Sequence, residues 1–304
     1  MTADPSLVIA WLVLAHLTAD FVLQTERMAV DKFGGGPKAW SALMAHVAVV
    51  GATLVPVVAV FGLPGVLFLA VTVLSHLLID RTKIVLSRRA EAAALRAARN
   101  ADAPDAPVAT LGAAWTPIPG ALFIADQLAH MVVLFVAWLV LLSGASPMDW
   151  GEGVTRRLVG SLDEATFHQL VLTALVVVDL LIVNVRAGAL FVATLVEPQE
   201  AVVGGADHDP TTEDQRLARE GMASPAKLGA TIGILERLVV VALVLAGQAA
   251  AIGLVIAAKT LARFKQLDDR RFAEYYLLGT LASVAVALIS GLIAVAVLGP
   301  ILRR

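Results

Sequence analysis

The chain has 304 residues, of which 59% are hydrophobic, and its mean hydropathy is +0.82. A soluble domain is about 45–50% apolar, and the excess here falls in runs of roughly 20 residues, the length that crosses a bilayer core of about 30 Å. The formal net charge of −2 gives no indication of nucleic-acid binding, which is typical of strongly basic domains. The chain has no cysteine, so disulfides, thiolate metal sites and cysteine nucleophiles are excluded.

Eight apolar runs are candidate membrane spans, and the first is expected to be retained because the N-terminus lacks the basic start of a secretory signal. The runs cover about residues 6–24, 42–61, 63–85, 121–142, 166–186, 229–247, 249–265 and 275–300. The seventh is short and carries Lys259, Arg263 and Lys265, so it either spans the membrane or lies along the interface. The sequence therefore predicts an all-α fold, a polytopic membrane helix bundle of seven or eight transmembrane helices.

Two polar stretches interrupt the apolar runs. Residues 86–120 pass from an Ala/Arg-rich segment into a Pro-rich one, and residues 197–228 are polar and contain a Gly-Gly pair. Both are expected to be surface loops. This pattern predicts a four-helix transmembrane half over residues 1–142, with the loop 86–120, and a second transmembrane half over residues 143–304, with the loop 197–228.

The placement of Lys and Arg predicts the orientation in the membrane. When the spans alternate, one side of the membrane receives 18 of the 23 basic residues and the other receives four. We expect the richer side, which includes both polar loops, to be cytoplasmic. The chain is then a multi-pass protein of the bacterial cytoplasmic (inner) membrane.

Histidines and carboxylates lie inside the first four spans, most of them in pairs four residues apart. The pairs are His16 and Asp20, His76 and Asp80, and Asp126 and His130. Four-residue spacing puts both members of a pair on one helix face. The order reverses in the fourth span, where the helix direction also reverses, so each carboxylate is expected one turn nearer the cytoplasm than its histidine. His46, in the second span, falls at the same depth.

Four imidazoles and three carboxylates at one level suit a divalent metal such as Zn²⁺, Mn²⁺ or Fe²⁺. Ionisable residues inside a membrane are costly and usually functional. We interpret five residues as metal ligands: His16, His46, His76, Asp126 and His130. Asp20, Asp80 and Lys83 are the catalytic candidates, and Gln24 and Gln127 would orient ligands or substrate. The same groups also suit a proton relay, or hydrogen bonds that hold the bundle together.

The second half carries its own polar candidates. They are Glu236, Arg237, Lys259 and Glu274. Glu236 and Arg237 are adjacent and point about 100° apart on a helix, so they cannot serve one another. Ion pairing is the favoured interpretation, for example of Glu236 with Lys259 or of Arg237 with Asp179.

The polar motifs resemble those of a bacterial family of uncharacterised integral-membrane proteins, known only as a domain of unknown function. In the first half the likeness lies in the HxxxD motifs at His16 and His76, in His46, and in the DQxxH motif that begins at Asp126. In the second half it lies in Glu236-Arg237, Lys259, Arg263-Phe264, Glu274-Tyr275 and Gly279-Thr280. The resemblance implies a membrane protein and no settled activity.

Our leading hypothesis is a membrane-embedded, metal-dependent hydrolase-like enzyme, in which one carboxylate acts as general base. Lys83 would receive a phosphate or another anionic head group of a lipid or lipid-linked substrate. The first alternative is a transporter of protons or divalent cations. The second is a structural or signalling membrane protein with a polar core. Because the outer halves of the four spans are almost purely apolar, a path through the membrane is less favoured than a one-sided site.

The span order predicts that residues 86–120 face the cytoplasm, because residues 81–99 carry six basic residues. Single cysteines placed at Ala103 and at Ser146 should therefore react with an impermeant thiol reagent from opposite sides of the membrane. The chain has no native cysteine to interfere. Labelling of both positions from the same side would reject the predicted order of spans.

Overall fold

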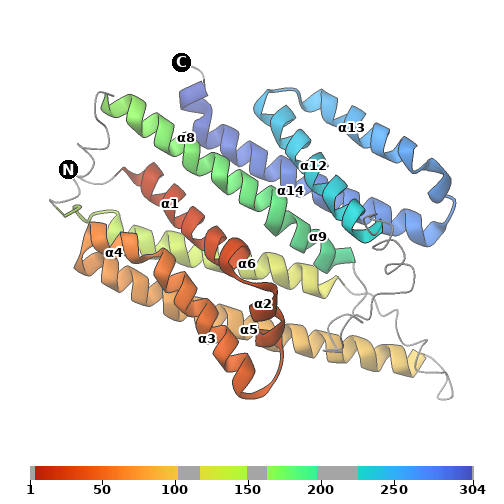
Figure 1. Ribbon diagram of the computed structural model, residues 1–304, viewed down its shortest axis with the longest axis horizontal. Helices are drawn as coiled ribbons and strands as arrows, with labels where there is room; N and C mark the ends of the chain where they lie inside the picture. Colours follow the sequence, from red (N-terminus) through yellow and green to blue (C-terminus); the bar gives the residue numbers. More distant parts are fainter. Residues whose placement is uncertain (1–3, 102–116, 149–162, 197–224, 303–304) are drawn as a thin grey trace, which may run out of the picture. The chain divides into compact units, whose positions relative to one another are not determined.

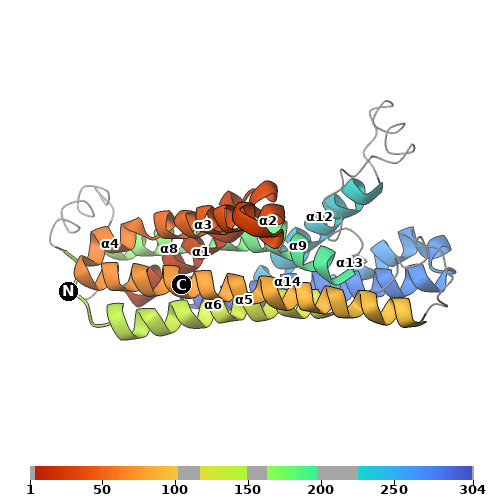
Figure 2. The ribbon, with the colours of Figure 1, turned by 90° about the horizontal axis from the view of Figure 1, so that it is seen from below.

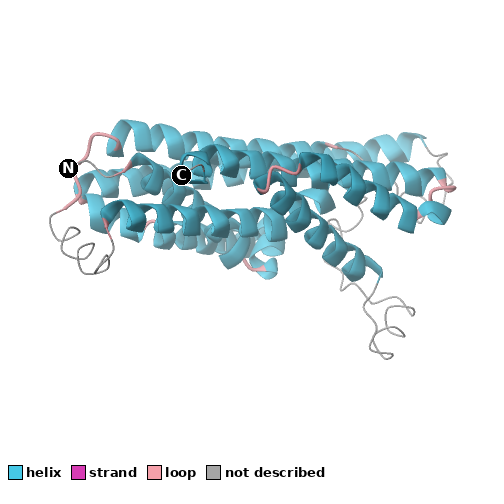
Figure 3. Cartoon of the chain, turned by 90° about the horizontal axis from the view of Figure 1, so that it is seen from above, coloured by secondary structure: helices cyan, strands magenta, loops and turns pink. Residues whose placement is uncertain are grey.

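The computed structural model describes residues 4–101, 117–148, 163–196 and 225–302. Within these ranges the chain is helical, short loops and turns join the helices, and no strand occurs (Figure 3). Seven of the described helices are long and apolar enough to cross a membrane: Pro5–Leu23, Gly36–Phe61, Leu63–Ala90, Ile118–Leu142, Glu164–Val196, Leu228–Leu245 and Phe272–Gly299. The predicted all-α polytopic bundle is confirmed, and these helices fit a multi-pass membrane protein.

The chain divides into two compact units, and the first contains residues 1–88, 122–186 and 298–304. Its elements are α1 (Pro5–Leu17), the π-helical η1 (Thr18–Leu23), α2 (Glu26–Phe33), α3 (Gly36–Thr53), α4 (Val55–Phe61), the first part of α5 (Leu63–Ala101), most of α6 (Ile118–Ala137), the π-helical η3 (Trp138–Leu142), α8 (Glu164–Ile182) and most of the π-helical η4 (Val183–Ala187). Helix α1 packs along α8, and α2 packs against α3 (Figure 1). Helices α5 and α6 run alongside each other (Figure 2).

The second unit contains residues 89–121 and 187–297. Its elements are the end of α5, α9 (Gly188–Val196), α12 (Pro225–Leu245), α13 (Ala249–Ala262), the short η5 (Phe264–Gln266) and most of α14 (Arg270–Leu302). The chain reverses at Gly247, whose φ of 69° is unfavourable for other residues, and α13 packs back on α12. The 14 residues of α13 span only about 21 Å, which is shorter than a bilayer core of about 30 Å.

Side-chain caps fix where several helices begin. The Asp4 carboxylate accepts hydrogen bonds from the amides of Ser6 and Leu7 at the start of α1. Thr25 caps α2 in the same way, and Asp163 caps α8 by accepting from the Thr166 amide. The hydrogen bonds from Thr166 lower the pKa of the Asp163 carboxyl. Such caps replace partners that the first turn of a helix cannot supply itself.

Three elements differ from the sequence-based expectation. Helix α5 continues to Ala101 rather than ending near residue 85, because its Ala- and Arg-rich extension consists of good helix formers. The fifth span continues through η4 and α9 to Val196. The connection between the first two predicted spans contains a further helix, α2, which was not predicted. Of the predicted loops, residues 102–116 and 197–224 lie outside the described residues, and Pro225 already begins α12.

Small residues allow the helices of the first unit to approach closely. Ala15 and Ala19 on the first span are 4% and 0% exposed, and they belong to a buried cluster with Leu54, Phe68 and Leu134 from the other spans. This apolar cluster adjoins the predicted His/Asp pairs, because Ala15 directly precedes His16 and Ala19 directly precedes Asp20. The apolar packing therefore fixes the rotation of the helices that carry the polar residues.

A tight turn joins α4 to α5 at two glycines. Gly62 has a φ of 59°, a left-handed conformation that favours glycine. Gly65 lies against the preceding helix so closely that a Cβ atom there would be 2.5 Å from the carbonyl oxygen of Val57. Backbone atoms cannot move aside as a flexible side chain can.

Gly65→Ala should therefore destabilise the protein by about 1–3 kcal/mol, the usual cost of overpacking. Gly253→Ala in α13 is the matched control, because a Cβ there meets nothing within 4 Å. It should leave the free energy of unfolding unchanged or raise it by about 0.5–1 kcal/mol through helix propensity. Denaturation in detergent measures both, and equal effects of the two substitutions would contradict the close approach.

Candidate functional site

The seven predicted histidine and aspartate side chains converge inside the first unit. They come from α1 and η1, α3, α5 and α6: His16, Asp20, His46, His76, Asp80, Asp126 and His130. Each is at most 8% exposed. Successive contacts connect all of them, and three overlapping groups have the spacing that could hold a metal ion. We refer to these seven residues as the His/Asp cluster.

Three ligand-type atoms form a triangle at the centre of the cluster. His46 Nε2 and His76 Nε2 are 3.0 Å apart. Asp20 Oδ1 lies 3.5 Å from the first and 3.6 Å from the second. Asp80 Oδ2 approaches from another side, 3.6 Å from His46 Nε2. Two imidazole nitrogens and a carboxylate oxygen therefore face one point in the interior of the protein.

His16 and Gln127 flank the triangle. His16 Nε2 is 3.1 Å from the amide oxygen of Gln127 and 3.7 Å from Asp20 Oδ2. The amide nitrogen of Gln127 donates to Asp20 Oδ2 at 3.4 Å and to Asp126 Oδ2 at 3.0 Å. Gln127 thus contacts one imidazole and two carboxylates, and its role in orienting ligands or substrate stays a prediction.

His130 is held in one tautomer. Its Nδ1 donates to the backbone carbonyl of Asp126 at 2.9 Å, because a carbonyl oxygen can only accept. Nε2 of the neutral ring then carries the lone pair, and it is buried without a hydrogen-bond partner. The ring centroid lies 4.2 Å from that of His76. A backbone carbonyl that holds Nδ1–H is the usual arrangement behind a metal-binding imidazole.

Two lysines neutralise two of the three carboxylates. Lys83 Nζ donates to Asp126 Oδ2 at 2.7 Å, as its position in the third span allowed. Lys32 Nζ donates to Asp80 Oδ2 at 2.8 Å and to Gln24 Oε1 at 2.7 Å. Lys32 is 5% exposed, although it lies on α2, outside any apolar run. Lys32 was not predicted as a site residue, although Thr25 is a helix-capping residue type and indicates that a short helix begins there.

Asp20 is the carboxylate that no lysine or arginine of the described residues neutralises. Its close charged or titratable neighbours are His16, His46 and His76. Oδ1 is buried without a hydrogen-bond partner. Because a buried charge needs compensation, this carboxylate requires an imidazolium or a bound cation.

Asp20 lies in the π-helical segment η1, where the helical hydrogen-bond pattern changes. Arg186, from η4, donates through Nε to the Phe21 carbonyl at 3.3 Å. The two π-helical segments therefore meet beside the cluster. Single π-turns inside α-helices are frequent at functional sites, because they redirect side chains.

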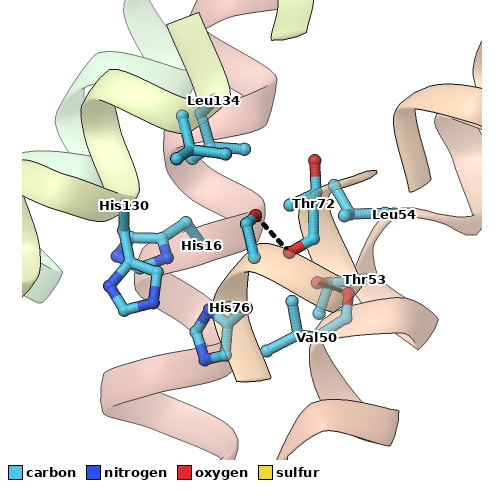
Figure 4. Close-up of a pocket in the computed structure, with 10 residues that line it drawn as sticks. His16, Val50, Thr53, Leu54, Thr72, His76, His130 and Leu134 are labelled. Carbon is cyan, nitrogen blue, oxygen red and sulfur yellow. Dashed lines mark hydrogen bonds between the residues drawn. The ribbon is translucent and has the colours of Figure 1, made fainter. Parts of the chain in front are cut away.

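A small cavity adjoins His16, His76 and His130. Its volume is about 10 Å³, and its lining includes His16, His76 and His130 on one side and Thr53 and Thr72 on the other (Figure 4). Thr72 Oγ1 is buried without a hydrogen-bond partner. A cavity of this volume is about large enough for one water molecule.

The polar candidates of the second half all lie in the second unit. Lys259 Nζ donates to Glu236 Oε2 at 2.6 Å, so the predicted ion pair is confirmed. Arg237 donates to Ser283 Oγ at 3.1 Å, and its pairing with Asp179 stays a prediction. Glu274 pairs with Arg270 on the surface, where the two side chains are 65% and 90% exposed. Its geometry is that of an ordinary surface ion pair.

The fold and the cluster define a polytopic helical protein with a buried site of imidazoles, carboxylates and lysines. Residues 8–150 match the family described as "Protein of unknown function (DUF3307)". The match includes the whole His/Asp cluster with Lys32 and Lys83, and it confirms the resemblance to an uncharacterised family. No curated protein and no solved structure matches the chain.

Removal of Lys32 should be strongly destabilising, because it leaves Asp80 charged and buried. For Lys32→Met we expect a loss of about 3–5 kcal/mol in the free energy of unfolding. Lys32→Met combined with Asp80→Asn should recover much of this loss, since the unpaired charge is then absent. Unfolding in detergent measures the cycle. Arg270→Met, which breaks an exposed pair, is the control and should have no measurable effect. Additive effects at positions 32 and 80 would contradict the pairing.

Proposed function

We propose that the His/Asp cluster binds one divalent transition-metal ion and that the protein is a membrane-embedded, metal-dependent hydrolase-like enzyme. The observation that carries the proposal is the position of Asp20. Three carboxylates and two ammonium groups leave one negative charge in the site, and it resides on the carboxylate that faces two imidazole nitrogens. A divalent cation would supply the missing positive charge at that point.

The distances in the triangle suit this ion. Ligand atoms bound at about 2.0–2.2 Å lie about 3.0–3.5 Å apart in tetrahedral or octahedral coordination. The three edges between His46 Nε2, His76 Nε2 and Asp20 Oδ1 are 3.0, 3.5 and 3.6 Å. Two histidines and one carboxylate on one face are typical ligands of catalytic Zn²⁺ and Fe²⁺, and they leave coordination positions open. His16, Asp126 and His130 are the further ligand candidates.

Hydrolysis is supported by the room for water next to the ligands. A metal-bound water can ionise near neutral pH and act as a nucleophile. The cavity beside His16, His76 and His130 has space for about one water molecule. Asp80, which Lys32 holds in place, is the candidate general base. Lys83 is 20% exposed at the edge of the cluster, where it would receive the anionic group of a lipid or lipid-linked substrate.

A proton relay is the second candidate, and one observation favours it. The 3.0 Å between His46 Nε2 and His76 Nε2 is a hydrogen-bond distance, so one proton shared by these rings would also balance Asp20. The same groups would then carry protons, in a transporter or a coupling protein. This reading needs no metal, and metal content therefore separates the two proposals.

Wild-type protein, purified without a His-tag or chelator, should contain close to one transition-metal ion per chain by elemental analysis. His76→Ala and Asp20→Ala should lose it. His168→Ala is the matched control and should keep it, because His168 lies apart from the cluster, against Asp4. Coordination needs a neutral imidazole, so bound metal should decrease as the pH falls through the histidine range, around 6.5 for an unperturbed ring.

If the wild-type protein holds no transition metal and added Zn²⁺ or Mn²⁺ does not raise its melting temperature, the proton relay replaces the metal proposal. If metal is bound, hydrolysis is tested in mixed micelles with lipid esters and lipid phosphoesters. Turnover should then be lost in His76→Ala. In Lys83→Met, KM for anionic lipids should rise more than KM for neutral ones.

A further inference from the structure

Helix α2 is attached to the His/Asp cluster from outside the membrane spans. Among the described helices of the first unit it is the one that lies outside the candidate spans, between the end of η1 and the start of α3 (Figure 1). Its eight residues extend about 12 Å. Its inner side carries Lys32, which is 5% exposed and bonds Asp80, while Arg27 and Val30 on the outer side are 85% and 67% exposed. Helix α2 therefore covers Asp80.

Two buried attachments, both in the last turn of α2, hold the helix in this position. Lys32 Nζ donates to Asp80 Oδ2 at 2.8 Å and to Gln24 Oε1 at 2.7 Å. Phe33 packs against a small apolar cluster that consists of Leu43, Val47 and Ile84. The ion pair of α2 with Lys38, which is 68% exposed, contributes little to stability. The docked position of α2 thus depends on Lys32 and Phe33.

Extended backbone flanks α2 on both sides. Gln24 and Thr25 precede the helix with ψ angles of 109° and 155°, and the glycines at positions 34–36 follow it. Gly36 has a φ of 74°, which favours glycine. Gly35 is extended, with a φ of −116°, and a Cβ atom there would meet nothing within 4 Å. The docked structure does not require glycine at position 35, and what glycine adds there is backbone freedom, as a hinge needs.

The proposed chemistry requires the His/Asp cluster to open. Each of its seven residues is at most 8% exposed, and the adjoining cavity is about large enough for one water molecule. A hydrated metal ion or a lipid head group is larger than this cavity. Displacing a span would separate apolar surfaces along its whole length, whereas α2 is short and attached at one end. Opening by α2 is therefore the least costly route.

We infer that α2 is a hinged cover of the His/Asp cluster, which turns about Gly35 and about Gln24–Thr25 and which Lys32 fastens to Asp80. The inference rests on the proposed function, because it states how a metal ion and a substrate reach that site. The oxygen that Lys32 binds, Asp80 Oδ2, is also the one that lies 3.6 Å from His46 Nε2. When α2 lifts, the ammonium leaves this oxygen, and the exposed carboxylate attracts an incoming divalent cation.

The test measures how fast a buried cysteine in the full-length protein reacts with a water-soluble methanethiosulfonate reagent. Ile84→Cys places the thiol in the apolar cluster against which Phe33 packs, where Ile84 is 1% exposed. Leu134→Cys is the reference, because Leu134 is 5% exposed and lies in the apolar cluster of the spans. The chain has no native cysteine, so each variant reports on one position. Opening of α2 should make Ile84→Cys react, whereas Leu134→Cys reacts only on unfolding.

Gly35→Ala fits the docked conformation and restricts the hinge. It should slow the reaction of Ile84→Cys by about two- to fivefold, because alanine gains less backbone freedom than glycine when α2 lifts. Gly253→Ala is the matched control, since its Cβ also meets nothing within 4 Å, and it should leave the rate unchanged. Equal rates with Gly35→Ala and Gly253→Ala would overturn the hinge.

The attachment of Lys32 is tested by Lys32→Met combined with Asp80→Asn. The double variant removes the ion pair without leaving an unpaired buried charge. It should accelerate the reaction of Ile84→Cys about tenfold, as expected for the loss of a hydrogen bond between charged groups, and leave Leu134→Cys unchanged. An equal acceleration at both positions would indicate general unfolding and would overturn the cover.

Metal exchange separates this inference from the proposed function. If the wild-type protein holds a metal ion, its loss to EDTA should slow in Gly35→Ala by the same factor as the cysteine reaction. If no metal is bound and the rates at Ile84→Cys change as described, the cover stands and the metal proposal fails. If metal is bound and neither Gly35→Ala nor the double variant changes these rates, the metal proposal stands and the cover is overturned.

Discussion

A carboxylate that is removed from water must be compensated where it lies, and three of them lie together in the first unit. The low dielectric makes each unpaired charge expensive, so the positions of the cations are as constrained as those of the acids. This explains why α2, a short polar helix, packs against α3: it places Lys32 on Asp80 at 2.8 Å. Asp20 is contacted by histidines instead of a lysine. The chemistry of the site therefore depends on whether an imidazolium or a bound cation compensates the charge of this carboxylate.

The helix packing of the first unit serves this arrangement. Ala15 and Ala19 are almost fully buried next to His16 and Asp20, so the first span lies close to its neighbours and its polar face cannot turn to lipid. The Phe21 carbonyl lies in the last turn of η1 and accepts a hydrogen bond from Arg186 Nε, which ties the fifth span to the same level. Apolar contacts and polar contacts therefore select one rotation of each helix.

The sequence predicted the spans and the His/Asp pairs because both depend on local rules. Hydropathy over roughly 20 residues predicts a span, and four-residue spacing puts His76 and Asp80 on one face. It could not predict that His46 and His76 meet at 3.0 Å, because that distance depends on how the helices are rotated and packed. Lys32 was missed for a related reason, since a hydropathy reading treats a charged segment between two spans as a connection.

The residues of the cluster come from two helical hairpins, residues 5–61 and 63–142, whose polar positions resemble one another. His16 and Asp20 correspond to His76 and Asp80 after a shift of 60 residues, and His46 corresponds to His130 after a shift of 84. The second hairpin contains the ion pair between Lys83 and Asp126, and the same shifts lead to Leu23 and Ala42 in the first. The first hairpin therefore lacks both the cation and the carboxylate of this ion pair. An ion pair lost or gained as a unit leaves no unpaired buried charge, so this difference is the kind that two copies of one hairpin can tolerate.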